Sequence, residues 1–112
     1  MQSINPVKRN IVNKLRGSQK NRLYFRKLAS YMEKPARSTK EVNLSKLDKL
    51  SKQGEDIAVP GKVLGFGKIG KKINVYALGF SKQAVEKIEK SGGKCLGMED
   101  LLKSGKTARI IV

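Results

Sequence analysis

The amino-acid sequence predicts an α/β protein, in which a basic helical N-terminal extension precedes an irregular core of strands and helices. Three observations lead to this class. Up to about residue 52, apolar side chains recur at helical spacings of three and four residues. From Asp56 onward, short apolar runs bounded by glycine and proline are typical of strands. A loose recurrence of strand, strand and helix then continues along the rest of the chain.

The length of 112 residues is enough for one domain and leaves little room for a second. We expect residues 1–52 to form the basic helical part and residues 53–112 to form the mixed core. Hydrophobic residues make up only 38% of the chain and charged residues 30%. We therefore expect part of the chain to be ordered by a partner rather than by its own core.

The first helix is expected to begin at Asn5 and Pro6, because this pair suits a cap followed by the first helical position. One apolar stripe runs along it, made of Ile4, Val7, Ile11 and Leu15. Gly17 and Ser18 end this helix.

A second helix is predicted from about residue 21 to residue 33, where Pro35 stops it. Its apolar residues are Leu23, Tyr24, Phe25, Leu28, Tyr31 and Met32. The aromatic side chains among them are expected in the core, because they recur at helical spacing; stacking on nucleic-acid bases is the alternative.

Residues 34–40 are polar, basic and expected to be irregular. A short third helix should follow, capped by Asn43 and carrying Leu44, Leu47 and Leu50. Val42 and Leu47 are placed to form a hydrophobic staple across this cap.

The β-rich part begins with the apolar run at residues 57–59, which Pro60 and Gly61 are expected to end. Val63 and Leu64 lead into a glycine-rich stretch, and residues 73–78 predict a strand buried on both faces. Ser81 should cap a helix that contains Ala84, Val85 and Ile88 and stops at Gly92-Gly93. A brief strand at residues 95–96, a helix at residues 98–103 and a strand at residues 107–112 complete the prediction.

The charge distribution points to a polyanionic partner, most plausibly nucleic acid. There are 25 Lys and Arg against nine Asp and Glu, a net charge of +16. The first 32 residues contain eight basic residues and no acidic one. Arginines are favoured because the guanidinium fork matches two phosphate oxygens at once. We expect phosphate contacts from Lys8, Arg9, Lys14, Arg16, Lys20, Arg22, Arg26, Arg37, Lys40, Lys62, Lys68, Lys71 and Lys72.

Other partners fit less well. A lipid surface would require a helix whose apolar face is filled with Trp, Phe or Leu, and the chain has no Trp. No run of about 20 apolar residues and no apolar stretch at the N-terminus is present. We therefore expect a protein that neither spans a membrane nor is secreted.

Residues 65–70 match the dinucleotide fingerprint G-x-G-x-x-G, and with Lys71 they nearly match a phosphate-binding loop. Both motifs require a helix directly after the loop, whereas a strand is predicted here. Lys72 also stands where a phosphate-binding loop needs Ser or Thr for magnesium. We expect a tight loop whose flanking lysines lie close to a phosphate backbone, and neither a dehydrogenase nor an NTPase.

Residues for catalysis are scarce, because the chain has no histidine and a single cysteine. No Cys or His cluster suits zinc, and the nine acidic residues mostly stand beside lysines as solvated surface. Cys95 is expected to be a small buried apolar residue that forms no internal disulfide and suits a reducing compartment. We expect no enzyme, no catalytic residue, no metal, no cofactor and no small-molecule substrate.

The sequence resembles the "eighteen-e" family of large-subunit ribosomal proteins of archaea and eukaryotes, which is related to bacterial ribosomal protein L-fifteen. The resemblance covers nearly the whole chain and is most specific from Pro60 to Gly93. It is carried by residues 33–37 (EKPAR), 41–47 (EVNLSKL), 59–67 (VPGKVLGFG), 73–81 (INVYALGFS), 84–88 (AVEKI), 92–93 (GG) and 109–112 (RIIV). Ala36 departs from the family pattern, in which a second arginine is common, and so removes one phosphate contact.

The resemblance implies a superhelical core of strand–strand–helix turns and a helical part embedded in ribosomal RNA. It also implies a structural role in the large subunit, with ribosomal RNA and neighbouring ribosomal proteins as partners and the cytoplasmic ribosome as location. Composition alone is equally compatible with an architectural DNA-binding protein, and the glycine loop leaves a nucleotide-using enzyme as a third possibility.

Overall fold

The computed structural model describes residues 13–17, 21–32 and 40–112, without the side chain of Lys40. Within these ranges, residues 13–16 are helical and Gly17 forms a turn, which confirms the end of the predicted first helix. The predicted start of that helix and the irregular segment at residues 34–39 lie outside the described residues. So do the expected phosphate contacts Lys8, Arg9, Lys20 and Arg37, and the side chain of the expected contact Lys40.

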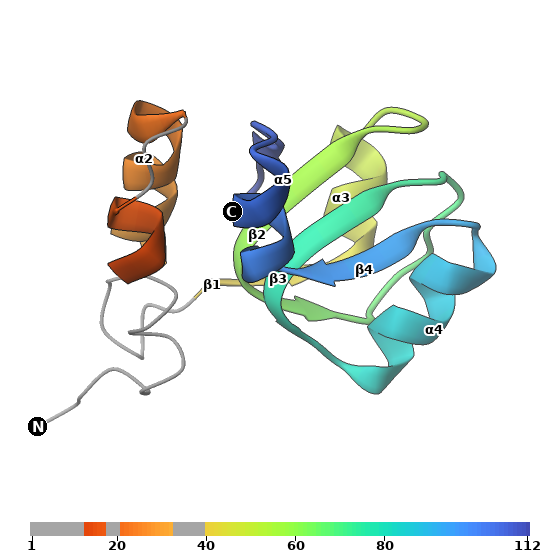
Figure 1. Ribbon diagram of the computed structural model, residues 1–112. Helices are drawn as coiled ribbons and strands as arrows, with labels where there is room; N and C mark the ends of the chain where they lie inside the picture. Colours follow the sequence, from red (N-terminus) through yellow and green to blue (C-terminus); the bar gives the residue numbers. More distant parts are fainter. Residues whose placement is uncertain (1–12, 18–20, 33–39) are drawn as a thin grey trace, which may run out of the picture.

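The core is a sheet of five parallel strands built around β2 (Asp56–Leu64) (Figure 1). One edge of β2 pairs with β3 (Asn74–Phe80), which in turn pairs with β4 (Lys94–Gly97). The other edge is shared end to end by two short strands, β5 (Arg109–Ile110) and β1 (Lys40–Asn43). The α/β class predicted from the sequence is confirmed.

Helices cover both faces of this sheet, so the protein has three layers. On one face, α3 (Leu44–Leu50) and α4 (Lys82–Lys90) pack on Ile57, Val59 and Val75. On the other, α2 (Arg22–Met32) and α5 (Met98–Ser104) pack on Ala58 and Tyr76. Successive residues of a strand point to opposite faces, and a parallel sheet needs both faces covered, which explains the continuous apolar runs.

The helix α2 is held to the rest of the protein by its apolar face and by hydrogen bonds. Phe25, Leu28, Ala29 and Met32 are buried. The Tyr24 hydroxyl donates to the Ala108 carbonyl, and the Asn21 side-chain amide donates to the carbonyl of Gly105. Tyr24 also meets Phe25 edge to face, with ring centroids 5.1 Å apart. Phe25 is therefore a core residue, as expected, and Tyr24 is partly buried against that core, where burial raises its pKa. Tyr31 was also expected in the core, but it is half-buried and belongs to neither core cluster.

The predicted end of the first strand was wrong. Pro60 and Gly61 do not end the strand, because β2 continues through them to Leu64. Val59 pairs with Ala77, and the next paired residues are Lys62 and Gly79, so β2 contains one more residue than β3 between these pairs and forms a bulge there. A bulge accommodates proline because it leaves a residue outside the hydrogen-bonded ladder.

The two edge strands also differ from expectation. The sequence pattern did not predict β1, because its four residues, KEVN, contain only one apolar side chain. The closing strand was predicted over residues 107–112, whereas β5 has two residues. Both strands are short because they divide one edge of β2 between them.

The helix caps were predicted at the correct positions, with one difference in chemistry. Ser81 caps α4, since its Oγ accepts from the Ala84 amide at 3.1 Å. Asn43 is the cap residue of α3, but its side chain makes no capping hydrogen bond. The Phe66 carbonyl accepts from the Ser45 amide at 3.2 Å instead. A loop remote in sequence therefore supplies the acceptor that a helix N-terminus requires.

Candidate nucleic-acid interface

The outer face of α2 is basic. Arg22 and Arg26 lie one helical turn apart and are exposed, along the flank of the buried face that contains Ala29. Lys27 and Leu23 lie on the side of α2 away from the buried residues; Lys27 is exposed and Leu23 is 83% exposed. Because the apolar face fixes the rotation of the helix, both guanidinium groups are directed toward solvent.

The preceding helical turn adds two more of the expected contacts. Leu15 is buried in the same cluster as α2, whereas Lys14 and Arg16 are exposed. Lys14 Nζ lies 3.5 Å from Glu99 Oε2 of α5. Both side chains of this pair are about half exposed, and exposed ion pairs are weak, so the pair does not hold Lys14 firmly to Glu99.

Lys62 extends the basic surface to the sheet. Val63 belongs to the core under α3 and α4, so Lys62, its neighbour in β2, points to the α2 side of the sheet and is exposed. We refer to these basic residues on one side of the sheet as the α2 surface: Lys14, Arg16, Arg22, Arg26 and Lys62.

The glycine-rich loop lies on the other side of the sheet, against α3 and α4. A side chain on Gly65 would place its Cβ 2.7 Å from Gln83 Cβ, and one on Gly67 would place it 2.6 Å from Ser45 Cβ. Gly67 also has φ of +98°, which favours glycine. The next regular element is the strand β3, so neither nucleotide-binding motif has the helix it requires.

Lys71 differs from the other expected contacts because its ammonium group is used inside the protein. It is half-buried, and Nζ donates to the carbonyl of Ser51 at 2.7 Å and to that of Asp48. It thereby satisfies carbonyls at the C-terminal end of α3. Lys68 and Lys72 are exposed, and we call these two residues the loop surface.

Lys87 of α4 is a structural residue that sequence reasoning missed. Its Nζ donates to the Gly65 carbonyl at 2.8 Å and to the Gly67 carbonyl at 2.9 Å. No local pattern distinguishes Lys87 from the surface lysines around it, because its acceptors lie 20 and more residues away.

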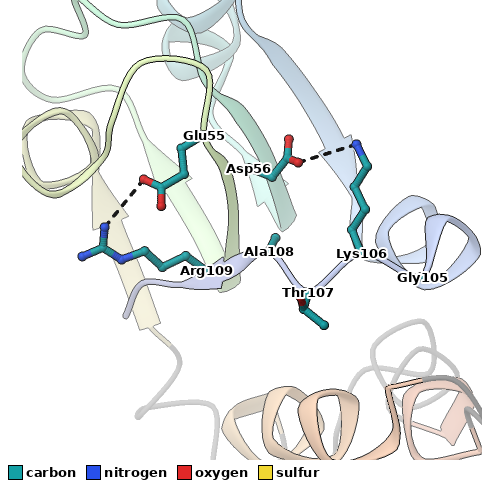
Figure 2. A pocket seen from close by; sticks show the side chains of 7 residues that line it. All are labelled: Glu55, Asp56, Gly105, Lys106, Thr107, Ala108 and Arg109. Carbon is teal, nitrogen blue, oxygen red and sulfur yellow. Dashed lines mark ion pairs between the residues drawn. The ribbon is translucent and has the colours of Figure 1, made fainter.

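A hollow of about 560 Å³ lies where β2 and β5 begin (Figure 2). Its charges do not suit a phosphate. Lys106 Nζ lies 3.6 Å from Asp56 Oδ2, and Arg109 Nη1 lies 3.6 Å from Glu55 Oε1. Each cation therefore has a carboxylate beside it. An incoming phosphate would meet two negative charges as well as two positive ones.

The remaining chemistry is sparse. In the part of the chain that the structure describes, no group of three His, Cys, Asp or Glu residues is placed to hold a metal ion. Within the same residues, no helix has the length and apolar character needed to cross a membrane. Cys95 is half-buried, and burial, reinforced by the Glu89 carboxylate, raises its thiol pKa to about 11. A thiol with that pKa is protonated at neutral pH and is a poor nucleophile.

Comparisons with known proteins agree on one family. A family model that covers ribosomal proteins 50S-L15 and 50S-L18e and the 60S protein L-twenty-seven-A matches residues 24–96. Large ribosomal subunit protein eL18 of Archaeoglobus fulgidus is 44% identical over 91 residues, which are 79% of this chain and 78% of that protein. The protein of that name from Sulfurisphaera tokodaii is 38% identical over 104 residues, 93% of this chain and 86% of the relative. That from Methanothermobacter thermautotrophicus is 37% identical over 101 residues, 88% and 84% of the two chains.

Proposed function

Because the chain belongs to the family of ribosomal proteins 50S-L15 and 50S-L18e, we propose that it is a structural constituent of the large ribosomal subunit that binds and stabilises folded ribosomal RNA. The observation that carries RNA binding is the exposed basic flank of α2, where Arg22 and Arg26 reach solvent beside the buried face of the helix. A net charge of +16 supports it, since such self-repulsion is relieved by a polyanion.

The two basic surfaces suggest how the protein acts. The α2 surface and the loop surface lie on opposite sides of the sheet, so one rigid core presents cations in two directions. Two RNA segments held against them would each gain charge neutralisation, and the sheet would fix the distance between them. Recognition is proposed to depend on phosphates and 2′-hydroxyls rather than on a base code.

Location and partners follow from this role. We propose that the protein is located in the cytoplasmic ribosome, beside other ribosomal proteins, and that it has no catalytic activity, cofactor or small-molecule substrate. Arg9, Arg37 and the other expected contacts outside the described residues remain part of the proposed interface.

The salt dependence of RNA binding tests the electrostatic part of the proposal. If about eight phosphates are neutralised, the logarithm of the affinity falls against the logarithm of salt concentration with a slope on the order of −6. Filter binding of the full chain to deproteinised large-subunit ribosomal RNA measures this slope. A slope shallower than about −2 would contradict the proposal.

Duplex DNA is the appropriate competitor, because composition alone does not exclude an architectural DNA-binding protein. We expect folded ribosomal RNA to displace duplex DNA from the protein when both are present at equal nucleotide concentration. Preferential retention of DNA would instead indicate an architectural DNA-binding protein.

A further inference from the structure

Phe66 is an exposed aromatic side chain in the middle of the glycine loop. Its side chain is 73% exposed, and the only other large apolar residues exposed in the described part of the chain are Leu23 and Leu50. Exposing a phenyl ring to water gains nothing for the fold. A role in contact with a partner would explain the position of this ring.

The backbone that carries Phe66 is held from several directions. On its two sides, Gly65 packs against α4 and Gly67 against α3, each too closely to admit a side chain. The Phe66 carbonyl accepts from the Ser45 amide, and Lys87 Nζ binds the carbonyls of both glycines. The ring is therefore presented on a fixed support, which lowers the entropy lost when it meets a partner.

The surroundings of the ring are cationic. A hollow of about 240 Å³ begins at the residue after Phe66 and is lined by Gly67, Lys68, Ile69, Lys87, Lys90 and Ser91. Lys68 and Lys90 are exposed, whereas Lys87 is occupied by the loop carbonyls. An exposed aromatic ring on a loop whose adjoining hollow is lined by two exposed lysines provides the two elements with which proteins bind single-stranded nucleic acid, a stacking surface and a basic groove.

We propose that Phe66 is a stacking platform for an unpaired base of the bound RNA, with the adjacent phosphate held between Lys68 and Lys90. The proposal rests on the proposed RNA-binding function and adds a base contact to it. A protein partner fits less well, because the core of a protein interface is depleted in lysine and gathers several apolar side chains, whereas Phe66 is the only exposed large one in this loop.

Fluorescence tests the stacking directly, because the chain contains no tryptophan. In Phe66→Trp the new indole is the only tryptophan fluorophore of the protein. The control variant Leu50→Trp carries its single tryptophan at an exposed position outside the loop. Deproteinised large-subunit ribosomal RNA is expected to quench the emission of Phe66→Trp strongly and that of Leu50→Trp weakly. Equal quenching of the two variants, or quenching of Phe66→Trp only after other ribosomal proteins are added, would overturn the proposal.

Affinity provides the second measurement. Phe66→Ala is expected to bind this RNA about 5- to 150-fold more weakly than the parent, whereas Phe66→Tyr retains the affinity. Thermal unfolding should be unchanged in both variants, because the ring is exposed. If the parent binds with a steep salt slope and Phe66→Ala binds equally well, stacking is wrong and RNA binding stands. If the parent itself does not bind, the proposed function fails first and the stacking proposal fails with it.

Discussion

Replacing Arg22 and Arg26 together by glutamine is expected to weaken RNA binding without loosening the fold. Both side chains are exposed on one flank of α2, while the side chains that hold this helix to the sheet are buried. Glutamine keeps a long polar side chain and good helix propensity, so the change removes charge and little else. The double variant therefore tests the α2 surface as a phosphate-binding element.

The magnitude follows from the number of charges removed. Each phosphate contact contributes about 0.7 to 0.9 to the slope of log affinity against log salt, depending on whether the RNA is single-stranded or duplex. Two contacts should make the slope shallower by about 1.4 to 1.8. At roughly 0.15 M salt, this corresponds to a loss of affinity of about 15- to 30-fold.

Filter binding to deproteinised large-subunit ribosomal RNA at several salt concentrations provides the assay. The matched control is Lys106→Gln with Arg109→Gln, which removes two positive charges that already face Asp56 and Glu55. Circular dichroism verifies that each variant is folded. The reasoning is refuted if the control loses as much affinity and as much slope as the α2 variant, because the effect would then reflect net charge alone.

Three further predictions concern the fold and its one thiol. Phe25→Ala is expected to lower the free energy of unfolding by about 3–5 kcal/mol, while Leu23→Ala on the exposed face changes it by less than about 0.5 kcal/mol. Urea unfolding measures both values, and similar losses for the two variants would show that α2 does not pack against the sheet through Phe25. Gly67→Ala should lower the free energy of unfolding by about 1–3 kcal/mol, because Gly67 has φ of +98° and packs against α3. Gly70→Ala adds a methyl group in open space and should leave that free energy unchanged. Thermal unfolding compares the two variants, and an unchanged stability of Gly67→Ala would contradict the packing. Alkylation of Cys95 by iodoacetamide should accelerate as the pH rises toward about 11, since the raised pKa keeps the thiol protonated at lower pH. A rate that is half-maximal at a pH near the pKa of an exposed thiol would contradict this prediction.

Features set by neighbouring residues were predictable from the sequence. Ser81 caps α4 with an oxygen only three residues from its donor, and the buried positions of α2 and α4 repeat at helical spacing. A run such as residues 73–78 is apolar at consecutive positions because helices cover both faces of the sheet. These signals require no knowledge of what lies far away in the chain.

Features set by distant partners were not predictable. The strand β1 forms because β2 offers it an edge, and Pro60 is tolerated in β2 because a bulge absorbs it. Lys71 and Lys87 resemble surface lysines in the sequence, yet their ammonium groups bind carbonyls of other segments. The exposure of Arg22 and Arg26 could be predicted from helical periodicity, whereas the separation of the exposed lysines and arginines into two surfaces depends on the sheet.

Co-sedimentation with large ribosomal subunits tests the central claim most directly. A tagged copy of the chain would be expressed in an archaeon that carries one of the relatives, such as Sulfurisphaera tokodaii. The lysate would be fractionated on a sucrose gradient at low salt and again after a moderate salt wash. The account predicts that the protein sediments with the large subunit and remains there after the wash. Free protein at the top of the gradient under both conditions would contradict it.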